Sequence, residues 1–199
     1  MPHTTVNASP SPLTRPRAGL AQEEAFREFI DRAAPRAMRV AWRLVGGDSS
    51  AADDVVQEAF MAAWKALPGF RGDSTLDTWF FRILVRRAQN YRRWRSLRTL
   101  WSDPTERESA DPKPVPCGDP LIRRRIVQAL DGLTHRQRES FVLVHMDGFT
   151  VREAASILGL RPGTVKSHLH RALRHLRTDL EDLNSPNAEL GKKENWRPR

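Results

Sequence analysis

TVREAASILGLRPGTVKSHL, residues 150–169, is the stretch that decides the fold of the C-terminal half. Thr150 and Glu153 have the spacing of a capping box, which begins a helix. Ala155 is small enough for a second helix to cross the first closely, and Gly159 can adopt the positive φ of the turn between them. The pattern therefore predicts a helix-turn-helix motif.

The second helix of this motif carries a basic face. Pro162 suits a first helical position, while Arg161 stands where Ser, Thr or Asp is the usual cap. From residue 161 to 177 there are five basic residues, three histidines and no acid, which fits a helix in the major groove of DNA. An ordinary αα-hairpin with a solvated basic face explains the small residue, the turn and the caps less well. The side chains predicted to face outward are Arg161, Thr164, Lys166, Ser167, His170, Arg171 and Arg174.

The sequence offers little for metal, redox or enzyme chemistry. His168 and His175 can share a helix face, but no third ligand accompanies them. Cys117 is the only cysteine, so an internal disulfide is excluded. Neither a nucleophile–base set nor a glycine-rich phosphate loop is present. We therefore expect no metal, no cofactor and no catalytic residues.

The charge of the chain points to an anionic partner. Its 199 residues carry a net charge of +9, which favours nucleic acid or an acidic membrane surface. No apolar run approaches the ~20 residues of a membrane helix, and residues 1–19 lack the apolar core of a secretory signal. We expect a cytoplasmic protein without membrane insertion.

Two basic blocks flank an acidic connector. Residues 22–100 hold 14 basic and 10 acidic residues, residues 121–183 hold 11 and 7, and residues 101–120 hold 2 and 5. The connector contains five prolines and no apolar periodicity, which is typical of a linker. We expect an all-α protein of two small helical domains joined by a flexible acidic linker. The expected segments are a disordered tail (1–21), a first domain (22–98), a linker (99–120), a second domain (121–183) and a polar tail (184–199).

Apolar residues three and four apart predict the helices of the first domain. The first runs over about 26–44, and Pro35 is expected to kink or restart it. Ser50–Asp53 has the spacing of a capping box for a second helix, which Pro68–Gly69 ends. A third follows over about 75–97. The second domain should contain helices over about 121–130, 134–146, 150–159 and 162–183.

The third helix is rich in arginine and aromatic residues. Seven arginines and no acid occur from Arg82 to Arg98, and arginine interleaved with aromatic rings can hold single-stranded nucleic acid. The alternative is that the aromatic residues belong to the core, and we favour it for Phe80, Phe81 and Leu84. For the preceding loop, residues 70–75, we favour a function.

An acidic cluster lies near the start of the second helix, at Asp53, Asp54, Gln57 and Glu58. Acids favour a helix N-terminus, which explains part of the cluster. Gln57 and Glu58 lie beyond that first turn. On local grounds, capping and a protein-binding surface are equal alternatives.

These three motifs, in this order, resemble the sigma-70 family and specifically its extracytoplasmic-function (ECF) group. Residues 53–64 resemble the family's core-binding helix, residues 70–83 its promoter-melting loop and helix, and residues 162–172 its recognition helix. The resemblance covers about residues 22–98 and 121–183. It implies sigma region 2 followed by sigma region 4, with only a linker between them as in the ECF group.

The resemblance also implies roles for individual residues. It assigns contact with the clamp helices of the largest polymerase subunit to Asp53, Asp54, Gln57, Glu58, Phe60 and Trp64. It assigns contact with the minus-ten element of the promoter, including one unstacked base, to Phe70, Arg71, Gly72, Asp73, Ser74, Thr75, Trp79, Arg82 and Arg86. It assigns the minus-thirty-five element to Arg161, Thr164, Lys166, Ser167, His170, Arg171 and Arg174.

Further partners follow from the same resemblance. They are promoter DNA, the flap of the second polymerase subunit and an anti-sigma factor, while the acidic linker would lie in the RNA exit path. The rival hypothesis is a stand-alone helix-turn-helix transcriptional regulator. Such a regulator would bind duplex DNA without polymerase, and it would leave the motifs in residues 22–98 unexplained.

Overall fold

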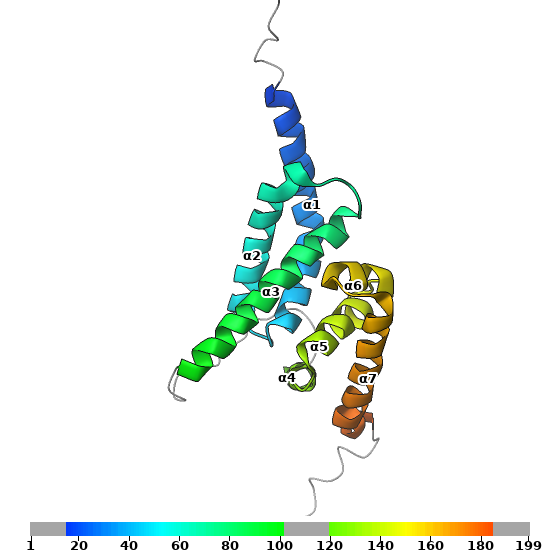
Figure 1. Cartoon of the computed structure of the whole chain (residues 1–199). Helices are drawn as coiled ribbons and strands as arrows, with labels where there is room; N and C mark the ends of the chain where they lie inside the picture. The colour runs from blue at the N-terminus through cyan, green and yellow to red at the C-terminus, as the bar shows by residue number, and fades with distance from the viewer. Residues whose placement is uncertain (1–14, 102–119, 185–199) are drawn as a thin grey trace, which may run out of the picture.

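The structure, a computed structural model, describes residues 15–101 and 120–184, and the side chains of residues 21–98 and 124–179. All the regular elements in these residues are helical (Figure 1). They are α1 (Arg15–Leu44), α2 (Ser49–Ala66), the 3-10 turn η2 (Leu67–Gly69), α3 (Leu76–Trp101), α4 (Pro120–Asp131), α5 (His135–Phe141), the π-helical η3 (Val142–Met146), α6 (Val151–Leu158) and α7 (Pro162–Asn184). The predicted all-α class is confirmed. The linker and tail predictions for residues 1–14, 102–119 and 185–199 lie outside the described residues.

Helix α1 differs from its prediction in where it begins and in its continuity at Pro35. It begins at Arg15, inside the expected tail, and it continues through Pro35 without interruption. The predicted restart at Pro35 was wrong because the flanking turns bury Ala33 and Ala37 against the core, while the proline itself is exposed. Packing on both sides offsets the one hydrogen bond that proline removes.

Helix α2 starts earlier than the predicted capping box. Its N-cap is Asp48, whose Oδ1 accepts a hydrogen bond from the amide of Ala51 at 3.0 Å. Asp48 follows two glycines with φ of +84° and +85°, which turn the chain sharply after α1. The box predicted at Ser50–Asp53 was therefore wrong by two residues, because an equally good capping side chain stands upstream.

Helices α1, α2 and α3 pack through an aromatic centre. The Phe60 and Phe80 rings stack at 4.5 Å between centroids, and Phe29 meets Phe80 edge-on at 5.4 Å. Phe80, Phe81 and Leu84 are fully buried, which confirms that these residues of α3 belong to the core. The helix continues beyond its predicted end to Trp101, into the segment expected as linker.

The C-terminal helices follow their local signals closely. Thr150 and Glu153 form the predicted capping box, with the Glu153 carboxylate accepting from the Thr150 amide at 2.8 Å. Gly159 adopts φ +65° at the turn between α6 and α7. Arg138, only 1% exposed, donates to the Leu130 carbonyl at 2.7 Å and so ties α5 to the end of α4.

The two halves of the chain pack directly on each other. Helix α6 packs against α3 (Figure 1), Gln89 of α3 donates to Glu139 of α5 at 2.9 Å, and the Phe149 ring contacts Phe81 at 5.0 Å between centroids. Buried residues from both halves form one continuous apolar cluster. The sequence predicted two domains joined by a flexible linker, and the linker composition contains no signal for this contact.

Candidate polymerase and nucleic-acid interfaces

The exposed face of α2 combines acidic and apolar side chains. Asp53, Asp54, Gln57 and Glu58 are all exposed, and helical spacing places them on the same side as Met61 and Trp64. Met61 is 49% exposed and Trp64 42% exposed, which is unusual for such large apolar side chains on one face. A face of this kind suits a protein partner better than it suits an anion.

Phe60 and Met61 of α2 differ in how far they are exposed. Phe60 is half-buried, and because its ring stacks on Phe80 it serves the core as well as the surface. Met61 was absent from the residues predicted to bind polymerase. The signal was present in the sequence, since an apolar residue four positions after Gln57 lies on the polar face rather than the buried one.

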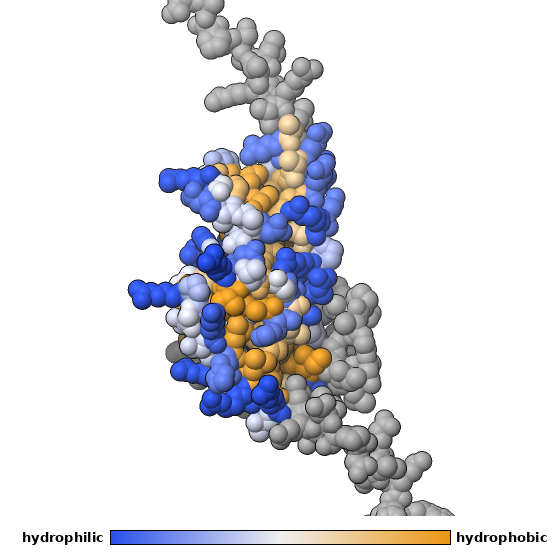
Figure 2. Space-filling model, turned by 90° about the vertical axis from the view of Figure 1, so that its right-hand side faces the viewer, coloured by the Kyte–Doolittle hydropathy of each residue, from blue (hydrophilic) through white to orange (hydrophobic). Residues whose placement is uncertain are grey.

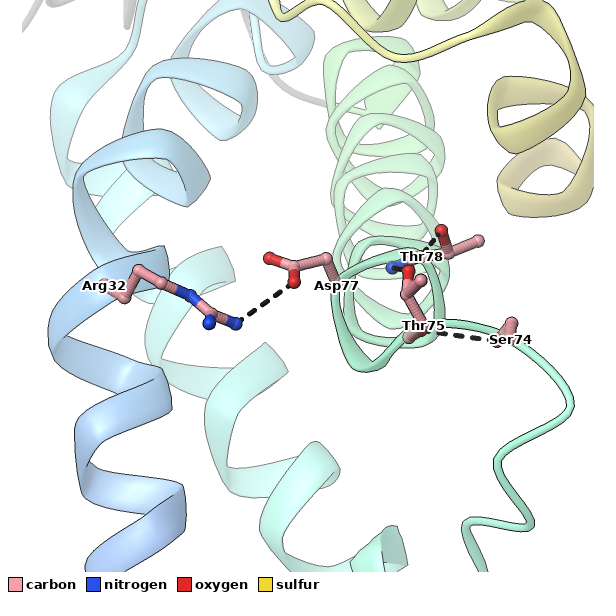
Figure 3. A network of polar contacts seen from close by, with 5 residues as sticks. All are labelled: Arg32, Ser74, Thr75, Asp77 and Thr78. Atoms are coloured by element: carbon pink, nitrogen blue, oxygen red, sulfur yellow. Dashed lines mark hydrogen bonds and ion pairs between the residues drawn. The ribbon is translucent and has the colours of Figure 1, made fainter.

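The loop before α3 is exposed and held at its end (Figure 3). Thr75 caps α3, because its Oγ1 accepts from the Thr78 amide at 3.2 Å and bonds the Thr78 hydroxyl at 2.9 Å. Asp77 pairs with Arg32 of α1 at 3.1 Å between Nη2 and Oδ2. Gly72 provides a φ of +76° in the loop. These contacts fix the base of the loop and leave residues 71–73 open to solvent.

Phe70 and Trp79 form an aromatic pair at this loop, with 5.2 Å between ring centroids. Both rings are half-buried, so each retains surface on which a base can stack. Arg71, Asp73 and Thr75 are exposed beside them. The structure therefore brings together most of the residues predicted to contact the minus-ten element.

Arg82 and Arg86 differ in their surroundings. Arg86 is exposed along α3. Arg82 donates from Nε to the Ser156 carbonyl at 3.1 Å and from Nη2 to the Ser156 hydroxyl at 2.8 Å. Ser156 belongs to α6, so a guanidinium predicted to hold DNA phosphates is bonded to the other half of the chain in this structure.

Helix α7 presents the predicted basic face to solvent. Every residue predicted to contact the minus-thirty-five element is exposed. The Arg161 carbonyl accepts from the Thr164 amide at 2.9 Å, so Arg161 caps α7 through its backbone. His170 Nε2 lies 3.0 Å from Arg174 Nη2. On the side of the molecule where α6 and α7 lie, apolar surface is framed by hydrophilic side chains (Figure 2).

Two of the histidines on α7 have described neighbours. His175 Nδ1 lies 3.0 Å from Asp179 Oδ2 one turn later. Burial, with Arg171 and Arg136 nearby, lowers the pKa of His168 below its ordinary value. His168 and His175 therefore have different surroundings.

Comparison with known proteins identifies two family regions in this chain. The family model for sigma-70 region 2 matches residues 29–98, and that for sigma-70 region 4 matches residues 123–176. The chain is 33% identical to the RNA polymerase sigma factor NccH of Alcaligenes xylosoxydans xylosoxydans, over 78% of this chain and 87% of that protein. It is 32% identical to the ECF sigma-E factor of Escherichia coli K12, over 65% of this chain and 74% of that protein.

Solved structures show the same fold. The sigma factor RpoE in complex with the anti-sigma factor NepR, from Bartonella quintana, matches with a TM-score of 0.69 and 30% identity, covering 79% of this chain and 98% of that one. CnrH in complex with the cytosolic domain of CnrY matches with a TM-score of 0.63 and 30% identity, covering 85% and 95%.

The chain belongs to the sigma-70 family of RNA polymerase sigma factors, and its relatives place it in the extracytoplasmic-function group. This family is not a family of enzymes. Among the helices that the structure describes, none is long and apolar enough to cross a membrane.

Proposed function

We propose that this chain binds core RNA polymerase and directs it to promoters with separate minus-ten and minus-thirty-five elements. The observation that carries the proposal is the presence of three exposed faces in one sigma-70 chain: the acidic-apolar face of α2, the loop before α3, and the basic face of α7. A stand-alone regulator would use only the last of these.

The α2 face is the proposed polymerase contact. Asp54, Gln57 and Glu58 would bind the clamp helices of the largest subunit, with Met61 and Trp64 as the apolar part of the interface. Exposed carboxylates around apolar anchors suit such an interface, because the anchors supply affinity and the charges supply orientation. The second region would contact the flap of the second subunit.

The loop before α3 and the α7 face are the proposed DNA contacts. Residues 70–75 would capture an unstacked base of the non-template strand, which offsets the few kcal/mol that unstacking costs. Arg86 and a released Arg82 would hold the neighbouring phosphates. Lys166, Ser167, His170 and Arg171 would contact base edges and phosphates in the major groove. This chain would make and break no bond, and it would act in the cytoplasm.

An anti-sigma factor is the proposed regulator. One of the similar structures contains the sigma factor RpoE with the anti-sigma factor NepR, and another contains CnrH with the cytosolic domain of CnrY. By analogy, a protein of this class would hold the present chain until a signal releases it.

The polymerase contact can be tested by affinity for sigma-free core enzyme. Replacing Gln57 and Glu58 together by Ala should weaken binding about tenfold, which corresponds to about 1.4 kcal/mol and is typical of losing part of an interface hot spot. The matched control is Glu28→Ala, an exposed acid on α1. Equal affinity of the double variant, the control and the wild type would contradict the assignment.

A further inference from the structure

A cavity of about 490 Å³ lies between α3, α5 and the end of α6. Its volume is within the range of roughly 300–1,000 Å³ that is usual for small-molecule sites. Val85 and residues 157–159 form its apolar and backbone walls. We call this cavity the arginine groove, after its polar lining of Arg82, Arg86, Gln89, Arg136 and Ser156.

Polar bonds between the helices hold the walls of the arginine groove in place. Arg82 of α3 donates to the Ser156 carbonyl at 3.1 Å and to the Ser156 hydroxyl at 2.8 Å. Gln89 of α3 donates to the Glu139 carboxylate at 2.9 Å, and Arg136 of α5 pairs with the same carboxylate at 3.0 Å. Arg136 is therefore held beside α3.

Positive charge in the groove exceeds negative charge. The partner of Arg82 is the neutral Ser156, and Arg82 keeps its Nη1 donors for a further partner. Arg86 is exposed, and among the described residues neither Arg82 nor Arg86 has a carboxylate partner. Arg136 has one, but Glu139 also accepts from Gln89. An anion in the groove would therefore meet guanidinium groups whose charge is not neutralised.

A second cavity continues the groove toward the end of α3. It shares Gln89 and Arg136 with the first cavity and adds Arg92, Arg93, Ser96, His135 and Glu139. The linings of the two cavities together contain five arginines, one histidine and one carboxylate. The excess of positive charge thus extends beyond the first cavity.

The titration of two groups in the second cavity agrees with this charge. Burial, and then the charge of Arg138, lowers the pKa of Arg92 to about 10. Burial, and then the charges of Arg92, Arg138 and Arg136, lowers the pKa of His135 below its ordinary value. Neighbouring charges that oppose a further positive charge favour a negative one.

We propose that the arginine groove binds a small molecule that carries two or more linked phosphate groups. Arg82 and Arg86 lie one helical turn apart, about 6 Å along α3, and Arg136 reaches the cavity from α5. Guanidinium groups bind phosphate oxygens in pairs, so three of them suit a chain of phosphates better than a single one. No aromatic side chain is among the described residues that line the cavity. The phosphates, and not a stacked base, are the part of the ligand that is recognised.

The groove overlaps the proposed DNA contacts without being identical to them. Arg82 and Arg86 are proposed to hold promoter phosphates, so the ligand would compete with the promoter for these two residues. That consequence rests on the proposed function, whereas binding of the ligand does not. Arg136 belongs only to the groove, and it therefore separates the two sites in an experiment.

Isothermal titration calorimetry of the full chain with sodium tripolyphosphate tests the site. We expect a single ligand per chain, and at least about tenfold weaker binding of orthophosphate, because it can contact fewer of the arginines. Arg136→Gln should weaken tripolyphosphate binding about tenfold. The control is Arg152→Gln, which removes an exposed arginine of α6 outside the groove. Its affinity should change by less than about twofold, because salt screens a distant surface charge.

Ser156→Asp is an independent test that keeps Arg136. It places a carboxylate where Arg82 now donates to a hydroxyl. Binding should weaken about tenfold or more, because this carboxylate pairs with Arg82 and repels the ligand. Ser156→Asn is the matched control of similar size without the charge, and it should bind nearly as tightly as the wild type. Thermal unfolding without ligand shows whether each variant is folded.

Three results would overturn the proposal. Equal losses in Arg136→Gln and Arg152→Gln would show attraction to net charge alone. Folded Arg136→Gln and Ser156→Asp variants that bind like the wild type would place the ligand elsewhere, and loss in Arg86→Gln alone would place it at the promoter-phosphate contact. Orthophosphate that binds as tightly as tripolyphosphate would show that linked phosphates are not recognised.

ATP distinguishes the two sources of such a ligand. Equal affinity for ATP and tripolyphosphate would support the proposal with an inorganic phosphate chain as the ligand. Tighter binding of ATP, lost in Arg136→Gln, would support it with a nucleotide as the ligand.

Discussion

Arg138 is the residue for which stability can be worked out most directly. It is fully buried, donates from Nε to the Leu130 carbonyl at 2.7 Å, and pairs with Asp131 at 2.8 Å. Burial lowers the pKa of this guanidinium, but Asp131 and Glu139 oppose that effect. The Arg138→Met variant keeps much of the packing volume and removes both interactions.

The magnitude follows from which partner is buried. Asp131 is 51% exposed, so water screens that ion pair and it contributes little. The Leu130 carbonyl would lose a charge-assisted hydrogen bond inside the protein, which costs about 2–3 kcal/mol. We therefore expect Arg138→Met to lower the free energy of unfolding by about 2–3 kcal/mol.

Urea unfolding measures this loss. With a slope of about 2 kcal/mol per molar, the midpoint should fall by about 1–1.5 M. The control is Arg125→Met, an exposed arginine on α4, which should change stability by less than about 0.5 kcal/mol. A midpoint shift for Arg138→Met no larger than that of the control would refute the reasoning that the Leu130 bond anchors α4 to α5.

Three further predictions concern DNA binding, a pair of glycines and pH. Lys166→Ala should lower the salt dependence of minus-thirty-five duplex binding by about one unit of slope, measured by titration at several salt concentrations. Gly159→Ala should lower the free energy of unfolding by about 1–2 kcal/mol, because φ is +65° there. Gly163→Ala lies inside α7 with open space around it and should raise the free energy of unfolding by about 0.5 kcal/mol, with both variants measured by thermal unfolding. Burial lowers the pKa of His135 and His168 below 6.5. As the pH falls through that value, the unfolded chain binds more protons than the folded chain, which destabilises the fold. The Tm should therefore drop between about pH 7 and about pH 5.5, and it should drop less when His135 and His168 are both replaced by Gln.

Local chemistry explains what the sequence could predict. The capping box at Thr150, the turn at Gly159 and the exposed basic face of α7 each depend on residues within a few positions of one another. The helix restart expected at Pro35 and the cap expected at Ser50 were wrong because the sequence cannot weigh a local signal against packing, or against a second good signal at Asp48.

The contact between the regions lay beyond local reasoning. Arg43 and Asp147 are 104 positions apart, and each is an unremarkable charged residue in its own helix or turn. Only the fold makes Asp147 buried and Arg82 unavailable. The residues proposed to bind DNA were therefore found from spacing and resemblance, whereas the contacts between the two halves required the three-dimensional structure.

The central claim, that this chain selects promoters for RNA polymerase, is tested most directly by reconstituted transcription. The purified protein would be mixed with sigma-free core enzyme and a library of promoter fragments, and the transcripts sequenced. We expect starts that share two separated upstream elements, with an altered minus-thirty-five preference in Arg171→Ala. Sequence-specific duplex binding by the protein alone, with no complex with core and no transcript, would contradict the claim and support a stand-alone regulator.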